Sequence, residues 1–476
     1  MRIRLLRFVI SALASAALFS GCAGGGSSVS QSAGTVPSAA QRGIVPNGQA
    51  EGGRQAHSGQ RRTLSEPTCS ASTLGVGAFI GGDGGNGGEG DNPNVANGQF
   101  AFVGAGSGNN ACDSWSAIAG GYNNAVSGSS EDGFIGAGEG NVVTGSDIDS
   151  LVVGGSGNQV SNADSAIVGG QSNKVSIDNG FVGGGSTNMM SGEYGAIVGG
   201  QNNDVSIDNG FLGGGSSNIV SGEYGAIAGG LHNMVSGQYG VLSGGNTNTV
   251  SGSAAVIAGG QGSLAEGAYA TVPGGYDNNA AGELSFAAGF KSYARYAGSF
   301  VWSDYASGAT LLESTGVNQF LARATGGFTL WTNAANTVGA KLAPGSGTWA
   351  SASDRNLKTD VARIDDAAVL DKVAALPIER WSYKSERGVR HVGPMAQDFY
   401  AAFGVGEDDK HITSIDEDGV ALAAIKALHA ENAHLRARLT AENATLRSRL
   451  AADEAHVRRV DAELDRIVAA LGNQPK

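Results

Sequence analysis

The sequence predicts a mainly β protein: a parallel β-solenoid, then a short β stem, a small α+β domain and a C-terminal coiled coil. The chain of 476 residues holds 79 glycines but only 9 prolines, and 15% of its residues are charged. So much glycine without a G-X-Y period excludes collagen, and an apolar fraction of 41% is too high for wholesale disorder. A repeat of about 15 residues and apolar residues at heptad spacing near the end support this architecture.

The N-terminus resembles a bacterial export signal. Three arginines precede an apolar stretch from Phe8 to Phe19, and small residues follow it. Residues 18–22 resemble a lipobox, in which Cys22 is lipidated after residues 1–21 are removed, and Ala23 suits sorting to the outer membrane. The resemblance implies an exported lipoprotein at the outer membrane or cell surface. A plain signal peptide with an incidental cysteine is the alternative.

Residues 22–74 are predicted to form a flexible linker, because they are rich in Gly, Ser, Gln and Ala and show no periodicity. Two cysteines remain after the signal, Cys69 and Cys112, and such a pair in an exported protein is a candidate disulfide. No residues have the spacing of metal ligands, so neither metal nor cofactor is expected. The net charge of −13 argues against nucleic acid as a partner, because phosphate binding needs clustered Lys and Arg.

A repeat fills residues 75–297: units of equal length begin at Ser161, and looser copies of the same core precede them. One unit, from Ser191, has the sequence SGEYGAIVGGQNNDV. Its run Ala196–Val198 is β-prone, Gly199-Gly200 allows a corner with positive φ, and residues such as Asn203 are expected to supply turns. Because a coil with so few apolar residues has a thin core, association of several chains is expected to bury the remainder.

This repeat resembles the head repeats of trimeric autotransporter adhesins, through its period and its apolar pair followed by Gly-Gly. The resemblance implies a left-handed parallel β-roll packed three to a bundle. It also implies a homotrimer whose further partner is a host-surface glycan or protein. A calcium-binding nonapeptide roll is the alternative, suggested by Gly81-Gly82-Asp83-Gly84-Gly85, but the repeats lack an Asp at nine-residue spacing.

Residues 298–350 are predicted to form a β stem. Three apolar-rich runs lie at 299–302, 318–323 and 327–331, and the last of them alternates with period two. These runs suit short strands of an intertwined stem, and they show no pattern of catalytic residues.

The segment Ser353-Asp354-Arg355-Asn356-Leu357-Lys358 resembles the signature that opens the intramolecular chaperone domain of endosialidases and related phage tail fibres. Two further blocks match in order, HVGPMAQD from His391 and a strand-and-helix block that begins at Ser414. The resemblance runs from residue 351 to the C-terminus. It implies a domain over 351–428 that brings three chains into register and is then released.

The resemblance places the cut between Ala352 and Ser353, with Ser353 as nucleophile and Lys358 as base. A serine hydroxyl needs a neighbour to take its proton, and a lysine does so only where burial or a nearby cation lowers its pKa. Arg355 is the candidate cation. His391 and Gln397 are candidate supporting residues.

Three alternatives remain open at this point. Ser353-Asp354 is a helix cap in the first, and Lys358 is a surface lysine. In the second, the module assembles trimers but does not cut. In the third, the fibre is an enzyme that acts on a surface glycan, although the repeats offer no separate catalytic domain. Beyond one cut in its own chain, no catalytic activity is expected.

The last segment, 429–476, is predicted to form a coiled coil. Asn432 is a polar layer of the kind that sets register, and the pattern slips between Leu446 and Leu450. The residues at a/d spacing are Ile425, Leu428, Asn432, Leu435, Leu439 and Leu446 before the slip, and Leu450, Val457, Val460, Leu464, Ile467 and Leu471 after it.

Overall fold

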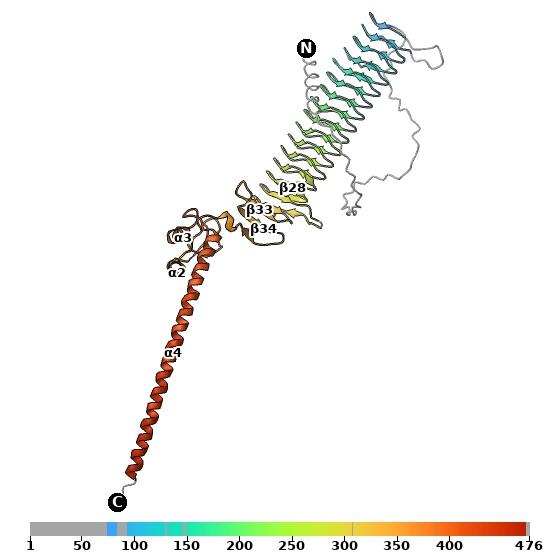
Figure 1. Ribbon diagram of the computed structural model, residues 1–476. Coiled ribbons are helices and arrows are strands. Elements are labelled where there is room, and N and C mark those ends of the chain that lie inside the picture. The colour runs from blue at the N-terminus through green and yellow to red at the C-terminus, as the bar shows by residue number, and fades with distance from the viewer. Residues whose placement is uncertain (1–73, 83–92, 129–130, 146–148, 307, 473–476) are drawn as a thin grey trace. The chain divides into compact units, whose positions relative to one another are not determined.

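The computed structural model describes residues 74–82, 93–128, 131–145, 149–306 and 308–472. A parallel β-solenoid of about 14 turns is followed by a small α+β region and a long C-terminal helix, which confirms these parts of the predicted fold (Figure 1). The predictions for residues 1–73, which include Cys22 and Cys69, lie outside the described residues.

Most strands of the solenoid have two residues, and they alternate between two parallel sheets. The first sheet contains β1 (Phe79–Ile80), β3 (Phe102–Val103), β5 (Ala117–Ile118), β7 (Phe134–Ile135), β9 (Leu151–Val152), β11 (Ala166–Ile167), β13 (Phe181–Val182), β15 (Ala196–Ile197), β17 (Phe211–Leu212), β19 (Ala226–Ile227), β21 (Val241–Leu242), β23 (Val256–Ile257), β25 (Thr271–Val272), β26 (Gly275–Tyr276), β28 (Phe286–Phe290), β30 (Phe300–Ser303) and β32 (Phe320–Arg323). The second sheet contains β2 (Val95–Ala96), β4 (Asn110–Ala111), β6 (Ala125–Ser127), β8 (Val142–Thr144), β10 (Gln159–Val160), β12 (Lys174–Val175), β14 (Met189–Met190), β16 (Asp204–Val205), β18 (Ile219–Val220), β20 (Met234–Val235), β22 (Thr249–Val250), β24 (Leu264–Ala265), β27 (Asn279–Ala280), β29 (Ser292–Ala294) and β31 (Leu312–Glu313).

The solenoid core is closed within one chain. Each strand pairs in parallel with the strand one coil away, so that Ala196 lies between Phe181 and Phe211. Because neighbouring residues of a strand point to opposite sides, the second residue of each pair points inward. Ile197 and Val205 are accordingly 0% exposed. One chain therefore fills its own core. The expected association of several chains stays a prediction, and it would cover the outward apolar side chains.

A column of buried asparagines runs along the corner between the sheets. The Asn203 backbone N–H donates to Asn188 Oδ1 (3.1 Å), and its Nδ2 donates to the carbonyls of Gly199 (3.0 Å) and Gly215 (3.2 Å). The Asn218 N–H in turn donates to Asn203 Oδ1 (3.1 Å). Asn203 thus caps the Gly199 carbonyl in its own corner, as expected from sequence, and it also links neighbouring coils. The column consists of Asn109, Asn124, Asn141, Asn158, Asn173, Asn188, Asn203, Asn218, Asn233, Asn248 and Asn278, with Ser263 in one coil.

The Gly-Gly corner is required by close approach of the coils. Gly200 has a φ of +91°, and a Cβ there would lie 2.2 Å from the carbonyl oxygen of Gly215 in the next coil. Any side chain at this position would push the coils apart, which confirms the corner predicted for this residue.

Parallel pairing continues beyond the repeat boundary expected at residue 297. The runs predicted as stem strands at 299–302 and 318–323 instead extend the first sheet, where Phe300 pairs with Phe286 and Phe320. Hydrogen bonds between parallel strands are made by backbone groups. They therefore continue beyond the repeat motif as long as the strands stay aligned. An antiparallel three-stranded sheet then follows, made of β33 (Phe328–Trp331), β34 (Gly339–Leu342) and β35 (Trp349–Ser351).

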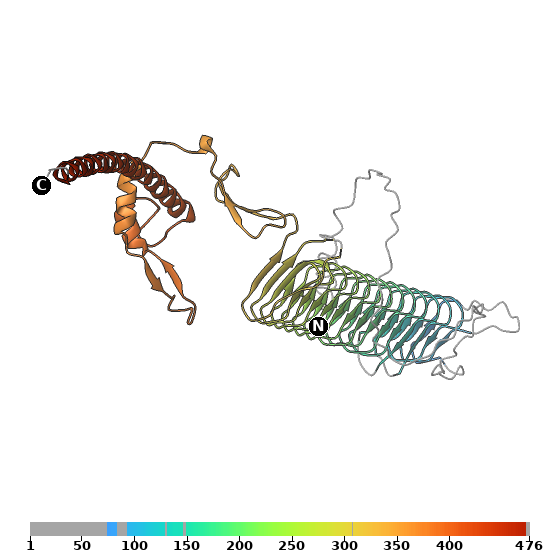
Figure 2. The same cartoon turned by 90° about the horizontal axis from the view of Figure 1, so that it is seen from below.

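The α+β region and the long helix follow. Their elements are the 3₁₀ turn η1 (Arg355–Leu357), α2 (Asp366–Ala375), the antiparallel hairpin of β36 (Glu379–Trp381) and β37 (His391–Gly393), α3 (Ala396–Phe403) and α4 (Ser414–Gly472) (Figure 2).

The strand expected from Ser414 does not form, because α4 begins there. Thr413 Oγ1 accepts the Asp416 N–H (3.2 Å) and donates to its carboxylate (2.7 Å), a reciprocal cap of a helix start. The α4 helix is continuous across the boundary predicted at 428, and Lys426 forms an ion pair with Asp366 of α2. In the part of the chain that is described, no helix is long and apolar enough to span a bilayer.

Asp204 has a partly buried carboxylate, which makes the stability of the solenoid depend on pH. It lies between Met189 and Ile219 on the second sheet, and its Oδ1 is buried without a hydrogen-bond partner. This desolvation raises the pKa of Asp204 above its usual value of 3.8. The folded state therefore holds this proton more tightly than the unfolded chain, and stability falls as pH rises from about 3.8 through the raised pKa.

Asp204→Asn removes the charge and should raise the unfolding temperature at pH 7, with no gain at pH 3, where the wild-type carboxyl is already protonated. Thermal unfolding followed by circular dichroism at both pH values checks this. An equal gain at both would show that ionisation is not the cause.

Candidate functional site

Ser353 and Lys358 are in direct contact. Lys358 Nζ donates a hydrogen bond to Ser353 Oγ at 2.7 Å, and both side chains are exposed in the single chain. A hydroxyl within hydrogen-bond reach of an amine is the minimal geometry of a nucleophile and its base.

One tight turn creates this contact. Asp354 caps η1, with its Oδ1 accepting the Asn356 N–H at 2.9 Å, and the Lys358 N–H donates to the Arg355 carbonyl at 3.2 Å. Asp354 and Lys358 have extended backbones on either side, so the five-residue spacing is spanned without a longer helix. The cap of the alternative interpretation is therefore present, and Asp354 supplies it, while Lys358 lies exposed at the surface with its Nζ bonded to Ser353 Oγ.

Sequence analysis assigned no role to Asn356, although the signal was present. An aspartate readily accepts the backbone N–H two residues later, and the pair Asp354 and Asn356 has that spacing. The Asn356 Nδ2 also donates to Asp354 Oδ1 at 3.1 Å, which further holds the turn.

The peptide bond before Ser353 is held from its N-terminal side. The Ala352 N–H donates to the Gly339 carbonyl at 3.0 Å, which extends the pairing of β35 with β34 by one residue. The Ala352–Ser353 bond therefore joins an anchored strand to a capped turn.

The three candidate supporting residues are not joined to this pair. Within the described residues, the Arg355 and Gln397 side chains make no hydrogen bond or ion pair, and Gln397 is exposed on α3. His391 instead lies 3.3 Å from Glu386 and stacks on Trp381 at 4.7 Å between ring centres. A site role for these residues stays a prediction.

The aromatic cluster around His391 was not predicted. Tyr383 meets the rings of Trp381 and His391 edge-on, at 4.9 and 5.6 Å. Trp381 and His391 are directly opposed in the β36–β37 hairpin, so strand pairing creates the contact. Trp381 Nε1 is buried without a hydrogen-bond partner in the chain.

The remaining expected sites concern cysteine and metal. Cys112 is disulfide-bonded, while Cys69 lies outside the described residues. Among the residues that can be described, no three His, Cys, Asp or Glu side chains gather as a metal site would require.

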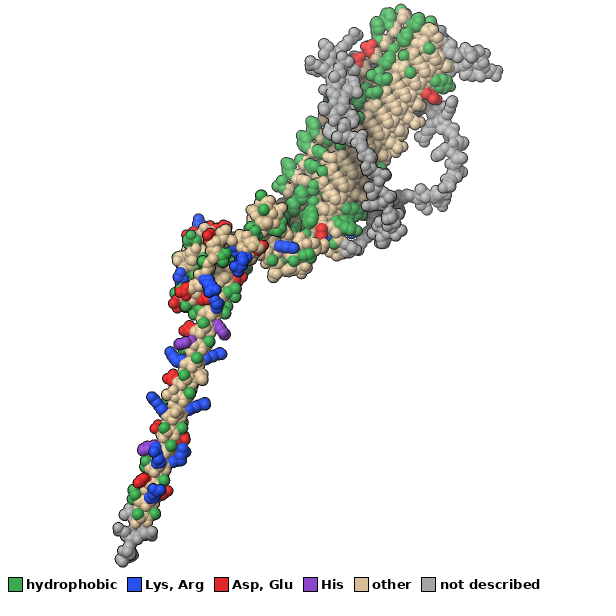
Figure 3. Space-filling model, viewed as in Figure 1, with side chains coloured by type: hydrophobic (Ala, Val, Ile, Leu, Met, Phe, Trp, Pro, Cys, Tyr) green, Lys and Arg blue, Asp and Glu red, His purple; other side chains and the backbone are tan. Residues whose placement is uncertain are grey.

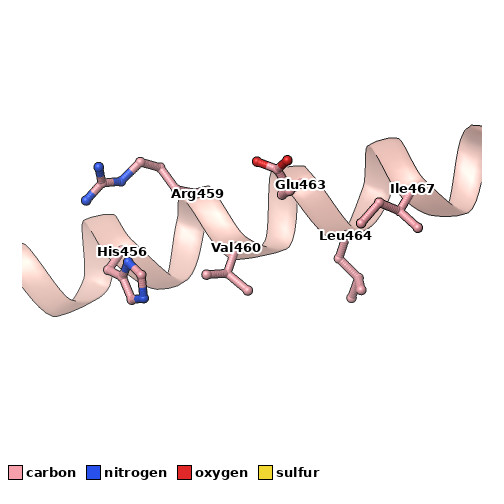
Figure 4. A pocket seen from close by; sticks show the side chains of 6 residues that line it. All are labelled: His456, Arg459, Val460, Glu463, Leu464 and Ile467. Carbon is pink, nitrogen blue, oxygen red and sulfur yellow. The ribbon is translucent and has the colours of Figure 1, made fainter.

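The α4 helix presents an uncovered apolar stripe. Leu439, Leu446 and Leu464 are 51%, 54% and 58% exposed, although all lie at a/d spacing. Figure 4 shows the distal part, where Val460 and Leu464 share one side of the helix with His456. A regular stripe of this kind is covered when helices of several chains pack together.

Residues 353–405 match the family model described as chaperone of endosialidase. No curated protein matches the chain significantly. The chain thus carries an intramolecular chaperone domain near its C-terminus, preceded by a β-solenoid, and domains of this family act in trimeric fibres, which implies self-association. The match ends before Ser414, so the third sequence block remains a resemblance.

Proposed function

We propose that this protein is a surface-anchored trimeric fibre whose chaperone domain aligns three chains and then cuts itself off between Ala352 and Ser353. The observation that carries the proposal is the 2.7 Å contact of Lys358 Nζ with Ser353 Oγ, directly after the bond to be cut. The hydrogen bond from Ala352 to Gly339 supports it, because the residue before the bond is fixed at the edge of the β33–β35 sheet.

The proposed cut is an acyl transfer followed by hydrolysis. Ser353 Oγ passes its proton to the neutral Lys358 amine and bonds to the carbonyl carbon of Ala352. The Ala352–Ser353 C–N bond breaks as its nitrogen takes the proton from Lys358, which leaves an ester. Water then cleaves the ester, giving a carboxylate at Ala352 and restoring the Ser353 hydroxyl. Each chain performs this sequence once.

Assembly is the proposed trigger. A lysine takes a serine proton efficiently only where burial or a neighbouring cation lowers its pKa, and one chain leaves both Ser353 and Lys358 exposed. Other copies of the chain would supply that burial. Cutting would then report that three chains had assembled.

The surface location rests on the sequence of the first 22 residues. Lipidation at Cys22 would hold the fibre at the outer membrane, and the solenoid would display its outward side chains to a host-surface glycan or protein. Release of residues 353–476 would leave the mature fibre attached.

Mass spectrometry of the protein purified from membranes of cells that export it tests the proposal. We expect two polypeptides, one ending at Ala352 and one beginning at Ser353, and sedimentation equilibrium should give three copies of the longer piece. An intact trimer would show that the domain assembles without cutting. A monomer would overturn the fibre.

A further inference from the structure

The outward side of the first sheet is uncharged along the whole solenoid. Its side chains lie in rows that follow the solenoid axis, and Figure 3 shows hydrophobic side chains in such rows. The outward strand residues are Phe79, Phe102, Ala117, Phe134, Leu151, Ala166, Phe181, Ala196, Phe211, Ala226, Val241, Val256, Thr271, Phe286, Phe300 and Phe320. The residues two positions later, from Gly81 to Pro273, are also uncharged.

These two rows fit each other. In the coils from Phe79 to Phe211 that have an outward Phe, the residue two positions later is Gly, and the ring lies next to it: a Cβ on Gly183 would be 3.5 Å from the Phe181 ring. In the next coil Ala196 replaces the Phe, and Val198 replaces the Gly. From Ala166 to Gly213 the bulky side chain alternates between the two rows, whereas one coil carries both Leu151 and Val153 and another carries Ala226 and Ala228.

The other sides of the solenoid are mixed, because exposed apolar side chains such as Met189 and Ile219 of the second sheet and Tyr194 of a turn lie there among charged and polar residues. The second sheet carries Lys174 and Asp204 on its outward side. A serine directly follows most of its central strands, as Ser176 follows β12. The turns leading to the first sheet carry Asp178, Glu193 and Glu223. A continuous apolar surface of this length is uncommon on a chain that works alone.

We infer that copies of this chain associate through the outward side of the first sheet. The inference rests on the proposed function and names the surface that the copies share. Its outward side chains recur once in every coil, so a partner must have the same axial spacing to match them over the whole length. Another copy of this solenoid has that spacing. Burial of Phe211 and Val198, which are 43% and 41% exposed in one chain, would then favour the assembly.

Cysteine reactivity in the full-length protein tests this surface. Ala196→Cys lies on the first sheet and Thr249→Cys on the second, and both positions are half-buried in a single chain. We expect a maleimide to label residue 196 at least about tenfold more slowly than residue 249 in the native assembly, because reaction must wait for opening of the interface. In denaturant the two rates should agree, and the wild-type protein gives the background from its own cysteines.

Sedimentation separates the possible failures. If the wild-type protein is a monomer, the proposed function fails. If it is a trimer in which residue 196 reacts as fast as residue 249, the fibre stands but this surface is not shared. As a second measurement, Ala226→Arg should lower the unfolding temperature of the assembly, whereas Thr249→Arg should leave it nearly unchanged. Equal effects would also overturn the inference.

Discussion

Replacing Ser353 by alanine should leave the exported chain uncut, because alanine has no oxygen to bond the carbonyl carbon of Ala352. Lys358→Met keeps the length of the side chain but removes the amine that takes the proton. We expect this change to slow the cut by about 10²–10⁴-fold, the usual contribution of a general base. A time course of denatured samples on a gel, with mass spectrometry of the bands, measures both effects.

Lys384→Met is the matched control for Lys358→Met, since it removes another lysine of the same domain, and it should cut at the wild-type rate. Both uncut variants should still assemble, because the Ser353–Lys358 contact is exposed and contributes little to packing. Cutting of Ser353→Ala at the same bond would assign the nucleophile elsewhere. An unchanged rate in Lys358→Met would exclude this lysine as the base.

The second large effect is expected from Asn203→Leu, which breaks the asparagine column in the middle of the solenoid. The Gly199 carbonyl would lose its donor and the Asn218 N–H its acceptor, whereas the Gly215 carbonyl would keep the Gln201 N–H. Each buried polar group left unpaired costs about 1–3 kcal/mol, so the total should reach roughly 3 kcal/mol or more. Hydrogen exchange should speed up in the coils around residue 203, and the unfolding temperature should fall.

Asn203→Ser is the control, because the chain itself places Ser263 in this column, where its N–H donates to Asn248 Oδ1 at 2.9 Å. The serine variant should lose clearly less stability than the leucine variant, since its hydroxyl can still accept the Asn218 N–H. Equal losses would show that the volume of the side chain matters here and that the hydrogen bonds between coils do not.

The candidate site could be predicted only in part. Resemblance pointed to Ser353 and Lys358, but a spacing of five residues on its own fits neither a helix face nor a strand face. The contact depends on η1, which is one turn long, and on the Asp354 cap. The hydrogen bond from Ala352 to Gly339 was out of reach, because its partner lies in another strand of a sheet whose pairing sequence alone does not specify.

Sequence by itself determined the solenoid. The apolar pair, the Gly-Gly corner and the constant unit length are local properties, and repetition makes neighbouring units stack with the same register. Only the tertiary structure showed which contacts neighbouring units make with one another. The asparagine column joins residues 15 positions apart, and the strands after residue 297 join the first sheet although their motif has changed. The asparagine column and these additional strands both depend on contacts between coils. The residues in such contacts are close in space but far apart along the chain. For the same reason, structure alone showed that the core closes within one chain and that the outward side of the first sheet is uncharged.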